Sequence, residues 1–211
     1  MADGTETRSL TLSTSDGLTL EAECRVPDDA SVAVVLCHPH PAAGGSMTSL
    51  VTSELFRLLP ASGIAVLRFN FRGVGASEGS HDGGVAERLD ILAAIDTMAA
   101  LCPNLPIHVC GWSFGADTSL AVLDARISSW VCCAPPLRVV PLEELTAAAG
   151  SDPRPKVLIV PEHDQFRVPA SAIEATADWV DTRVVAVSGA DHFFVGRTDK
   201  VAVLVTEAVR A

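Results

Sequence analysis

Short, nearly apolar runs recur along the chain, and stretches with apolar residues at helical spacing separate them. Such runs are typical of strands that helices cover on both faces. We expect strands over Val32–Cys37, Ile64–Phe69, Ile107–Cys110, Trp130–Cys133, Val157–Val160 and Arg183–Val187. The patterns between and after them predict helices over Met47–Leu59, Val85–Leu101, Ala116–Ala125, Ala170–Val180 and Val201–Val209.

The N-terminal part of the chain has a different pattern. Leu10–Leu12 and Leu18–Ala22 are separated by Asp16–Gly17, which predicts an antiparallel hairpin. The later alternation of strand and helix requires parallel strands joined by right-handed crossovers. The sequence therefore predicts one α/β domain over residues 1–211, with a mostly parallel twisted sheet, an antiparallel N-terminal hairpin and helices on both faces.

Composition narrows the functional classes. The chain has 211 residues, of which 48% are hydrophobic, and this suits a single compact domain. Its net charge is −11 and it has no basic patch, so we expect neither nucleic acid nor an anionic membrane as partner. The N-terminus is polar and acidic, and no apolar run reaches membrane-spanning length, so we expect a cytoplasmic protein. The oligomeric state is left open.

Cysteine and histidine placement argues against a metal site. Five of the six cysteines lie in or at the ends of strand-like runs, and no C-x-x-C pair occurs. We expect buried free thiols that act as small hydrophobes. His38 and His40 form an H-x-H pair, but no third ligand stands at a suggestive spacing. We expect His38 to tie its loop by hydrogen bonds, and no metal or cofactor.

The segment Gly111-Trp112-Ser113-Phe114-Gly115 carries the candidate chemistry. It follows an apolar strand and precedes a helical run, which is the setting of a nucleophile elbow. In such a tight turn a side chain at either glycine position would collide with neighbouring backbone, and the serine oxygen is held away from the sheet. Ser113 is therefore a candidate nucleophile. The alternative is a glycine-rich turn with an exposed serine, and partners elsewhere must decide.

A serine nucleophile needs a base, and the base needs an orienting acid. His192 follows the last strand and precedes the last helix, which places it at the carboxyl edge of the sheet. Asp164 follows the strand Val157–Val160, and the order Ser–Asp–His is the one expected of this arrangement. Glu162 and Asp191 are alternative acids, with Glu162 the main rival.

The third requirement is a pair of backbone N–H groups for the developing oxyanion. Phe114, directly after the candidate nucleophile, should supply one. The loop after Val32–Cys37 should supply the other. Pro39 and Pro41 have no N–H, so His40 is the best donor there. Gly44 and Gly45 allow the loop to turn back toward the site.

Together these segments resemble the α/β-hydrolase superfamily, and more narrowly the small lidless bacterial hydrolases related to dienelactone-hydrolase-like enzymes. Dienelactone hydrolases proper use a cysteine nucleophile, whereas position 113 is serine. The region 134–155, where larger relatives insert a lid, is short and holds one candidate helix, Leu142–Ala149. The resemblance rests on Cys37–Pro41, Gly44–Met47, Arg68–Gly79, Gly111–Gly115 and Gly189–Phe194.

This resemblance implies a Ser113–His192–Asp164 triad and ester-type acyl chemistry. It also implies that Arg72–Ser77 is a structural turn near the site, with Arg72 anchoring loops. We therefore expect a serine hydrolase that cleaves a small-molecule carboxylic ester through an acyl-enzyme, with no cofactor. A thioesterase, a lactonase or a small peptidase would use the same catalytic residues. A non-catalytic binding protein on the same fold is the alternative from another class.

Overall fold

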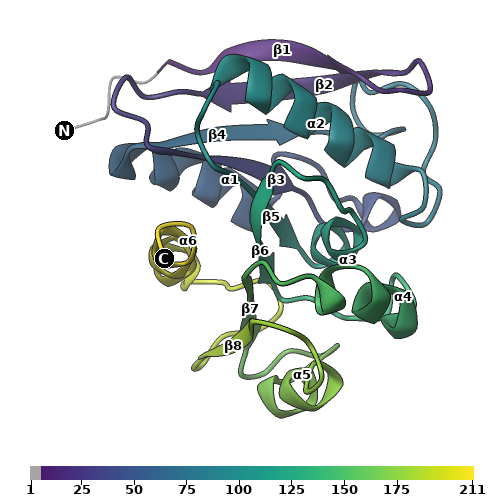
Figure 1. The fold of residues 1–211 in the computed structure, drawn as a ribbon, viewed down its shortest axis with the longest axis vertical. Helices are drawn as coiled ribbons and strands as arrows, with labels where there is room; N and C mark the ends of the chain where they lie inside the picture. The colour runs from purple at the N-terminus through teal and green to yellow at the C-terminus, as the bar shows by residue number, and fades with distance from the viewer. Residues whose placement is uncertain (1–5) are drawn as a thin grey trace.

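The protein, described here from a computed structural model over residues 6–211, is built on one eight-stranded sheet (Figure 1). The strand order is β1-β2-β4-β3-β5-β6-β7-β8. β1 and β2 form the antiparallel hairpin, β2 also pairs antiparallel with β4, and the remaining pairs are parallel, which confirms the predicted fold class. The strands are β1 (Arg8–Ser13), β2 (Thr19–Arg25), β3 (Val32–Cys37), β4 (Ile64–Phe69), β5 (Ile107–Trp112), β6 (Ile127–Cys133), β7 (Lys156–Pro161) and β8 (Thr182–Val187).

Helices cover both faces of this sheet. α1 (Leu50–Leu58) and α6 (Thr198–Ala208) pack together on one face. Figure 1 shows α2 (Glu87–Leu101) crossing the other face, where α3 (Phe114–Leu120) and α5 (Pro169–Ala175) also pack. The remaining short elements are α4 (Leu142–Ala147) and the 3-10 turns η1 (Pro41–Ala43), η2 (Leu59–Ser62) and η3 (Ala149–Ser151).

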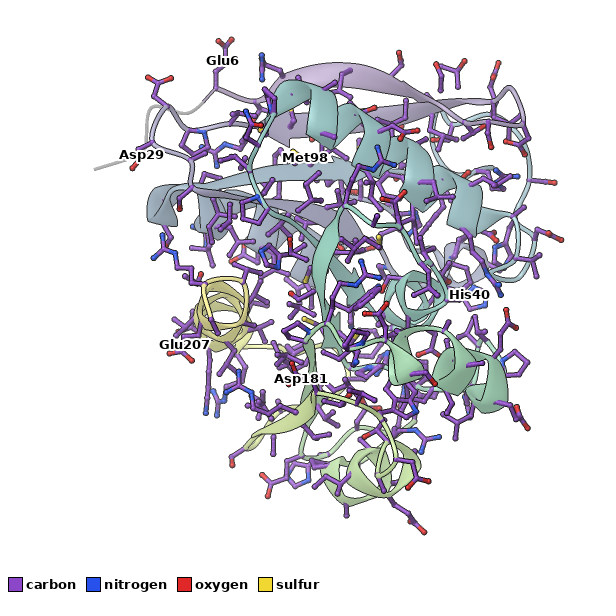
Figure 2. The ribbon with its side chains drawn as sticks, viewed as in Figure 1. Glu6, Asp29, His40, Met98, Asp181 and Glu207 are labelled. Atoms are coloured by element: carbon purple, nitrogen blue, oxygen red, sulfur yellow. The ribbon has the colours of Figure 1, made fainter. Side chains whose placement is uncertain are left out.

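Strand β3, near the centre of the sheet, is apolar at every position because it serves two cores. On β3, Ala33, Val35 and Cys37 point to the core under α2 and α3, whereas Val34 and Leu36 point to the core under α1 and α6. Met98 of α2, labelled in Figure 2, is fully buried in the first of these cores. The continuous apolar runs in the sequence are thus the two interleaved faces of buried strands.

Helix boundaries differ from those predicted, most of all at the end of α3 and at the end of α5, which stops at Ala175 rather than Val180. The helix after the serine begins at Phe114 rather than Ala116, and it ends at Leu120 rather than Ala125. It ends early because the N–H groups of Ala121 and Val122 donate to carbonyls three residues back, which tightens the last turn. α1 ends at Leu58, and η2 follows with Pro60 near its start, where a missing N–H costs nothing.

Residues 134–155 fold onto the body of the protein. α4 and η3 occupy most of the predicted helix Leu142–Ala149, and Leu145 and Ala149 are buried in the core under α2 and α3. All six cysteines are free and buried, as expected of small hydrophobes. Within the described residues, no helix has the length and apolar character needed to cross a membrane.

Candidate active site

Ser113 lies at the junction between β5 and α3 in a strained conformation. Its φ is 55° and its ψ is −115°. This backbone conformation is unfavourable for any residue other than glycine. A Cβ atom on Gly111 would lie 2.3 Å from the carbonyl oxygen of Gly115, and one on Gly115 would lie 2.4 Å from that of Cys37. Only glycine fits at either place, which explains why the serine stands between two glycines.

The structure brings Ser113, His192 and Asp164 together in one hydrogen-bonded chain. His192 Nε2 lies 2.9 Å from Ser113 Oγ, and His192 Nδ1 lies 2.8 Å from Asp164 Oδ2. An ionised carboxylate only accepts hydrogen bonds, so Nδ1 carries the proton and Nε2 presents its lone pair to the serine hydroxyl. All three residues are buried.

The rival acids contact other groups. Glu162 is exposed and accepts the N–H of Gly189 at 2.8 Å, which braces the loop that carries His192. Asp191 accepts the N–H groups of Phe193 and Val195. Asp164 is oriented toward the imidazole because its other oxygen accepts the N–H of Phe166 at 2.7 Å. Of the three candidates, Asp164 alone forms a hydrogen bond with His192 in the described structure.

Aromatic residues hold the imidazole in place. Trp112 Nε1–H donates to the carbonyl of His192 at 3.1 Å, which ties the base loop to the end of β5. The rings of Phe166 and Phe193 meet the imidazole edge-on, with centroids 4.5 and 5.5 Å away. Sequence reasoning missed these supports, because nothing in the local pattern marks Trp112 or Phe166 as neighbours of a residue so distant in the chain.

The two residues predicted to supply the N–H donors lie side by side. The rings of His40 and Phe114 are 5.0 Å apart, and both residues line the same cavity as Ser113. Figure 2 shows His40 close to α3. Over residues 6–211, no hydrogen bond of the loops and caps uses the backbone N–H of either residue. Burial lowers the pKa of the His40 side chain, so the imidazole is neutral near pH 7.

Two further residues have the structural roles expected of them. His38 is fully buried, bonds Pro39 O through Nδ1 at 2.6 Å and accepts the N–H of Phe71 at Nε2. Burial lowers its pKa to about 4, which keeps it neutral. Arg72 bonds Asp90 at 2.7 Å and Asp16 at 2.9 Å, and so anchors the turn that follows it. The expectations for His38 and Arg72 are confirmed.

A second carboxylate–imidazole pair stands beside the N–H donors. His81 Nδ1 lies 2.6 Å from Glu87 Oε1, and the fully buried Glu87 also accepts the N–H groups of Asp82 and Gly84. Burial opposes ionisation of Glu87, but these hydrogen bonds keep its pKa below the usual value. The His81 ring lies 5.0 Å from that of His40. No sequence pattern predicted this pair. His81 and Glu87 are six residues apart with a loop between them, and this spacing matches neither the period of a helix nor that of a strand.

Ser113 and His192 line a cavity of about 290 Å³. The loop from Pro39 to Gly45 forms one wall, and Pro136, Arg138 and Val139 contribute another. Gln165, Phe166 and Phe193 lie on the side of His192. The volume is at the small end of ligand cavities, which run from about 300 to 1,000 Å³.

Comparison with known proteins identifies the family of the chain. Residues 28–198 match the family model described as "Serine aminopeptidase, S33". An uncharacterized protein of Rickettsia prowazekii is 31% identical over 182 residues, which cover 82% of this chain and 75% of that protein.

Solved structures give the same assignment. An α/β serine hydrolase homologue from Coxiella burnetii is 29% identical, with a TM-score of 0.83 over 95% of this chain and 96% of the other. An α/β serine hydrolase without a lid from Xanthomonas campestris is also 29% identical, with a TM-score of 0.85 over 98% and 94%. The matched region contains the serine turn, the acid loop and the base loop, and the chain belongs to the serine aminopeptidase S33 family of α/β hydrolases.

Proposed function

We propose that this protein is a serine hydrolase that cleaves small carboxylic esters through an acyl-enzyme. One observation carries the proposal: Asp164, His192 and Ser113 form a continuous hydrogen-bonded chain, with distances of 2.8 and 2.9 Å, at the wall of a small cavity. The tautomer that this chain imposes on His192 is the one that accepts a proton from serine.

In the first half of the reaction, Ser113 Oγ attacks the acyl carbonyl and its proton passes to His192 Nε2. Asp164 accepts the Nδ1–H and stabilises the imidazolium that forms. The backbone N–H groups of His40 and Phe114 donate to the developing oxyanion, and one such donor contributes on the order of 3–4 kcal/mol. His192 then donates its proton to the leaving alcohol, and the acyl group stays on Ser113.

In the second half, His192 takes a proton from water as the water oxygen attacks the acyl-enzyme carbonyl. His192 then returns this proton to Ser113 Oγ as the bond to the acyl group breaks and the carboxylic acid leaves. Each half of the reaction therefore begins with the unprotonated imidazole as proton acceptor.

The family description raises a second candidate, an aminopeptidase. Such an enzyme must recognise the ammonium group at a peptide N-terminus, for which a carboxylate is the ordinary partner. No aspartate or glutamate from residues 6–211 lines the cavity, and the one permanently charged side chain there belongs to Arg138. This charge pattern favours an ester over a peptide N-terminus.

Labelling with a fluorophosphonate probe tests the proposal. Native protein should be labelled, and Ser113→Ala should not. A panel of short esters, thioesters, lactones and aminoacyl anilides then separates the candidate reactions by kcat/KM. If the native protein is neither labelled nor active on any of the panel, it is a binding protein on this fold.

A further inference from the structure

Arg138 brings a positive charge to the cavity of this acidic protein. It lines the cavity beside Ser113 and His192, and its side chain is exposed. No carboxylate among residues 6–211 lies within ion-pair distance of its guanidinium. Six other arginines do have such partners: Arg57, Arg68, Arg72, Arg88, Arg126 and Arg154. The guanidinium of Arg138 is therefore a cation at the cavity that no described carboxylate neutralises, in a protein whose net charge is −11.

The backbone of Arg138 is held firmly to the element that carries the nucleophile. The N–H groups of Leu137, Arg138 and Val139 all donate to the carboxylate of Asp117, at 2.9, 2.8 and 2.9 Å. Asp117 is fully buried on α3, the helix that begins directly after Ser113. Three charge-assisted hydrogen bonds to a rigid helix fix the place from which the Arg138 side chain extends.

The side chain is oriented as well. The guanidinium carbon of Arg138 lies 4.8 Å from the centre of the Phe166 ring. The same ring meets the His192 imidazole edge-on at 4.5 Å. Phe166 thus lies between the Arg138 guanidinium and the His192 imidazole and contacts both. A substrate whose carbonyl lies at Ser113 could therefore place a substituent, a few bonds from that carbonyl, against Arg138.

The chemistry of the group suggests its ligand. A guanidinium stacked on an aromatic ring keeps its planar set of N–H donors free, and this set matches the two oxygens of a carboxylate. Gln165, the residue before Phe166, also lines the cavity, and its side-chain amide bonds no other residue of the described chain. Arg138 is therefore the one permanent cation among the described residues that line the cavity, and no aspartate or glutamate among them would repel an anion.

We propose that Arg138, with Gln165 beside it, binds a carboxylate carried by the substrate. The preferred substrates are then anionic esters: monoesters of dicarboxylic acids, or esters of hydroxy acids. This inference rests on the proposed esterase function and specifies its substrate class. If Arg138 served only to cover the Phe166 ring, the enzyme would show no preference for anionic esters.

Two matched pairs of esters test the inference in a pH-stat. Monomethyl adipate and methyl hexanoate differ by a carboxylate on the acyl side, and 4-acetoxybutanoate and butyl acetate differ by a carboxylate on the alcohol side. We expect the anionic member of at least one pair to have a kcat/KM at least tenfold higher. Added salt should reduce this ratio, because it screens the exposed cation.

Variants assign the preference to the guanidinium. Arg138→Gln should reduce the anionic-to-neutral ratio at least tenfold, and Arg138→Lys should retain part of it, because lysine keeps the charge but loses the planar fork. Arg57→Gln is the matched control: it removes the same charge from an exposed site outside the cavity and should leave the ratio unchanged. Thermal melts check that the exposed substitutions preserve the fold.

The two proposals fail in different ways. If the native enzyme hydrolyses neutral esters in a Ser113-dependent way but prefers the anionic member of neither pair, the inference is wrong and the esterase proposal stands. The inference is equally wrong if a preference exists but survives Arg138→Gln. If no ester is hydrolysed and Ser113 is not labelled, the proposed function fails and the inference fails with it.

Discussion

Gly115 packs directly against the carbonyl of Cys37: a Cβ atom on Gly115 would lie 2.4 Å from that oxygen. This contact joins the turn that bears Ser113 and Phe114 to the end of β3, where the loop with His40 begins. The distance between the proposed oxyanion donors, the N–H groups of His40 and Phe114, therefore depends on position 115 having no side chain.

The first prediction concerns this contact. Gly115→Ala must displace β3 or the serine turn, because backbone atoms of two strand-end residues occupy the space that the methyl group needs. We expect a loss of about 1–3 kcal/mol in the free energy of unfolding, as for other overpacked sites. The kcat for a short ester should fall at least tenfold. Gly17→Ala is the control: its φ of +89° makes it strained, but its Cβ would meet nothing within 4 Å, so kcat should be unchanged.

The second prediction identifies the acid. Asp164→Asn should lower kcat/KM for a short ester by roughly 10⁴-fold, as in other triads, because the amide no longer fixes the imidazole tautomer. Glu162→Gln should lower it less than tenfold, since Glu162 bonds the N–H of Gly189 rather than the imidazole. Steady-state kinetics on the purified variants decides between them, and a larger loss from Glu162→Gln than from Asp164→Asn would contradict the assignment.

These two acids show where sequence reasoning reaches its limit. Asp164 and Glu162 follow the same strand two residues apart, so strand position alone does not choose between them. The choice is made by backbone N–H groups: that of Phe166 turns Asp164 toward His192, and that of Gly189 draws Glu162 away. Such contacts form only in the folded structure, and no local pattern of apolar and polar residues in the sequence indicates them.

The central strands and the serine turn were predictable because their structural requirements appear in the local sequence. Val32–Cys37 is apolar throughout because two cores demand it, and this demand is visible in the sequence itself. Gly111 and Gly115 mark the serine turn because no larger residue fits. Asp117 and the His81–Glu87 pair left no such mark, since their partners lie on loops whose paths follow from the finished fold.

The third prediction concerns stability and pH. Burial raises the pKa of Asp117 to about 6, although three backbone N–H groups oppose the shift. The folded protein then binds the proton more tightly than the unfolded chain does. The contribution of this titration to stability is present below about pH 4, where both states are protonated, and it is lost as the pH rises through about 6.

Denaturant unfolding of the native protein and of Asp117→Asn at several pH values tests this sign. The free energy of unfolding of the native protein relative to the variant should decline, by on the order of 2–3 kcal/mol, between pH 4 and pH 7. Groups common to both proteins cancel in this difference. A difference that stays constant over this range, or grows with pH, would show that folding does not raise the pKa of Asp117.

The fourth prediction concerns the His81–Glu87 pair. The His81 ring lies 5.0 Å from that of His40 and 5.3 Å from that of Phe114, the two residues whose N–H groups we assign to the oxyanion. His81→Ala should lower kcat for a short ester roughly three- to tenfold with little change in KM, because a displaced donor weakens the transition state more than the bound substrate. It should also cost about 1–3 kcal/mol in unfolding, since buried Glu87 loses a hydrogen-bond partner.

His81→Phe separates these two effects. Phenylalanine restores a ring against His40 and Phe114 but cannot bond Glu87, so kcat should recover while the stability loss remains. His163→Ala is the matched control, because His163 is exposed and makes no ring contact with the oxyanion residues in the described structure. If His81→Ala keeps the native kcat, the ring does not position His40. If kcat and stability fall together and phenylalanine restores neither, the hydrogen bond to Glu87, and not the ring, maintains the loop.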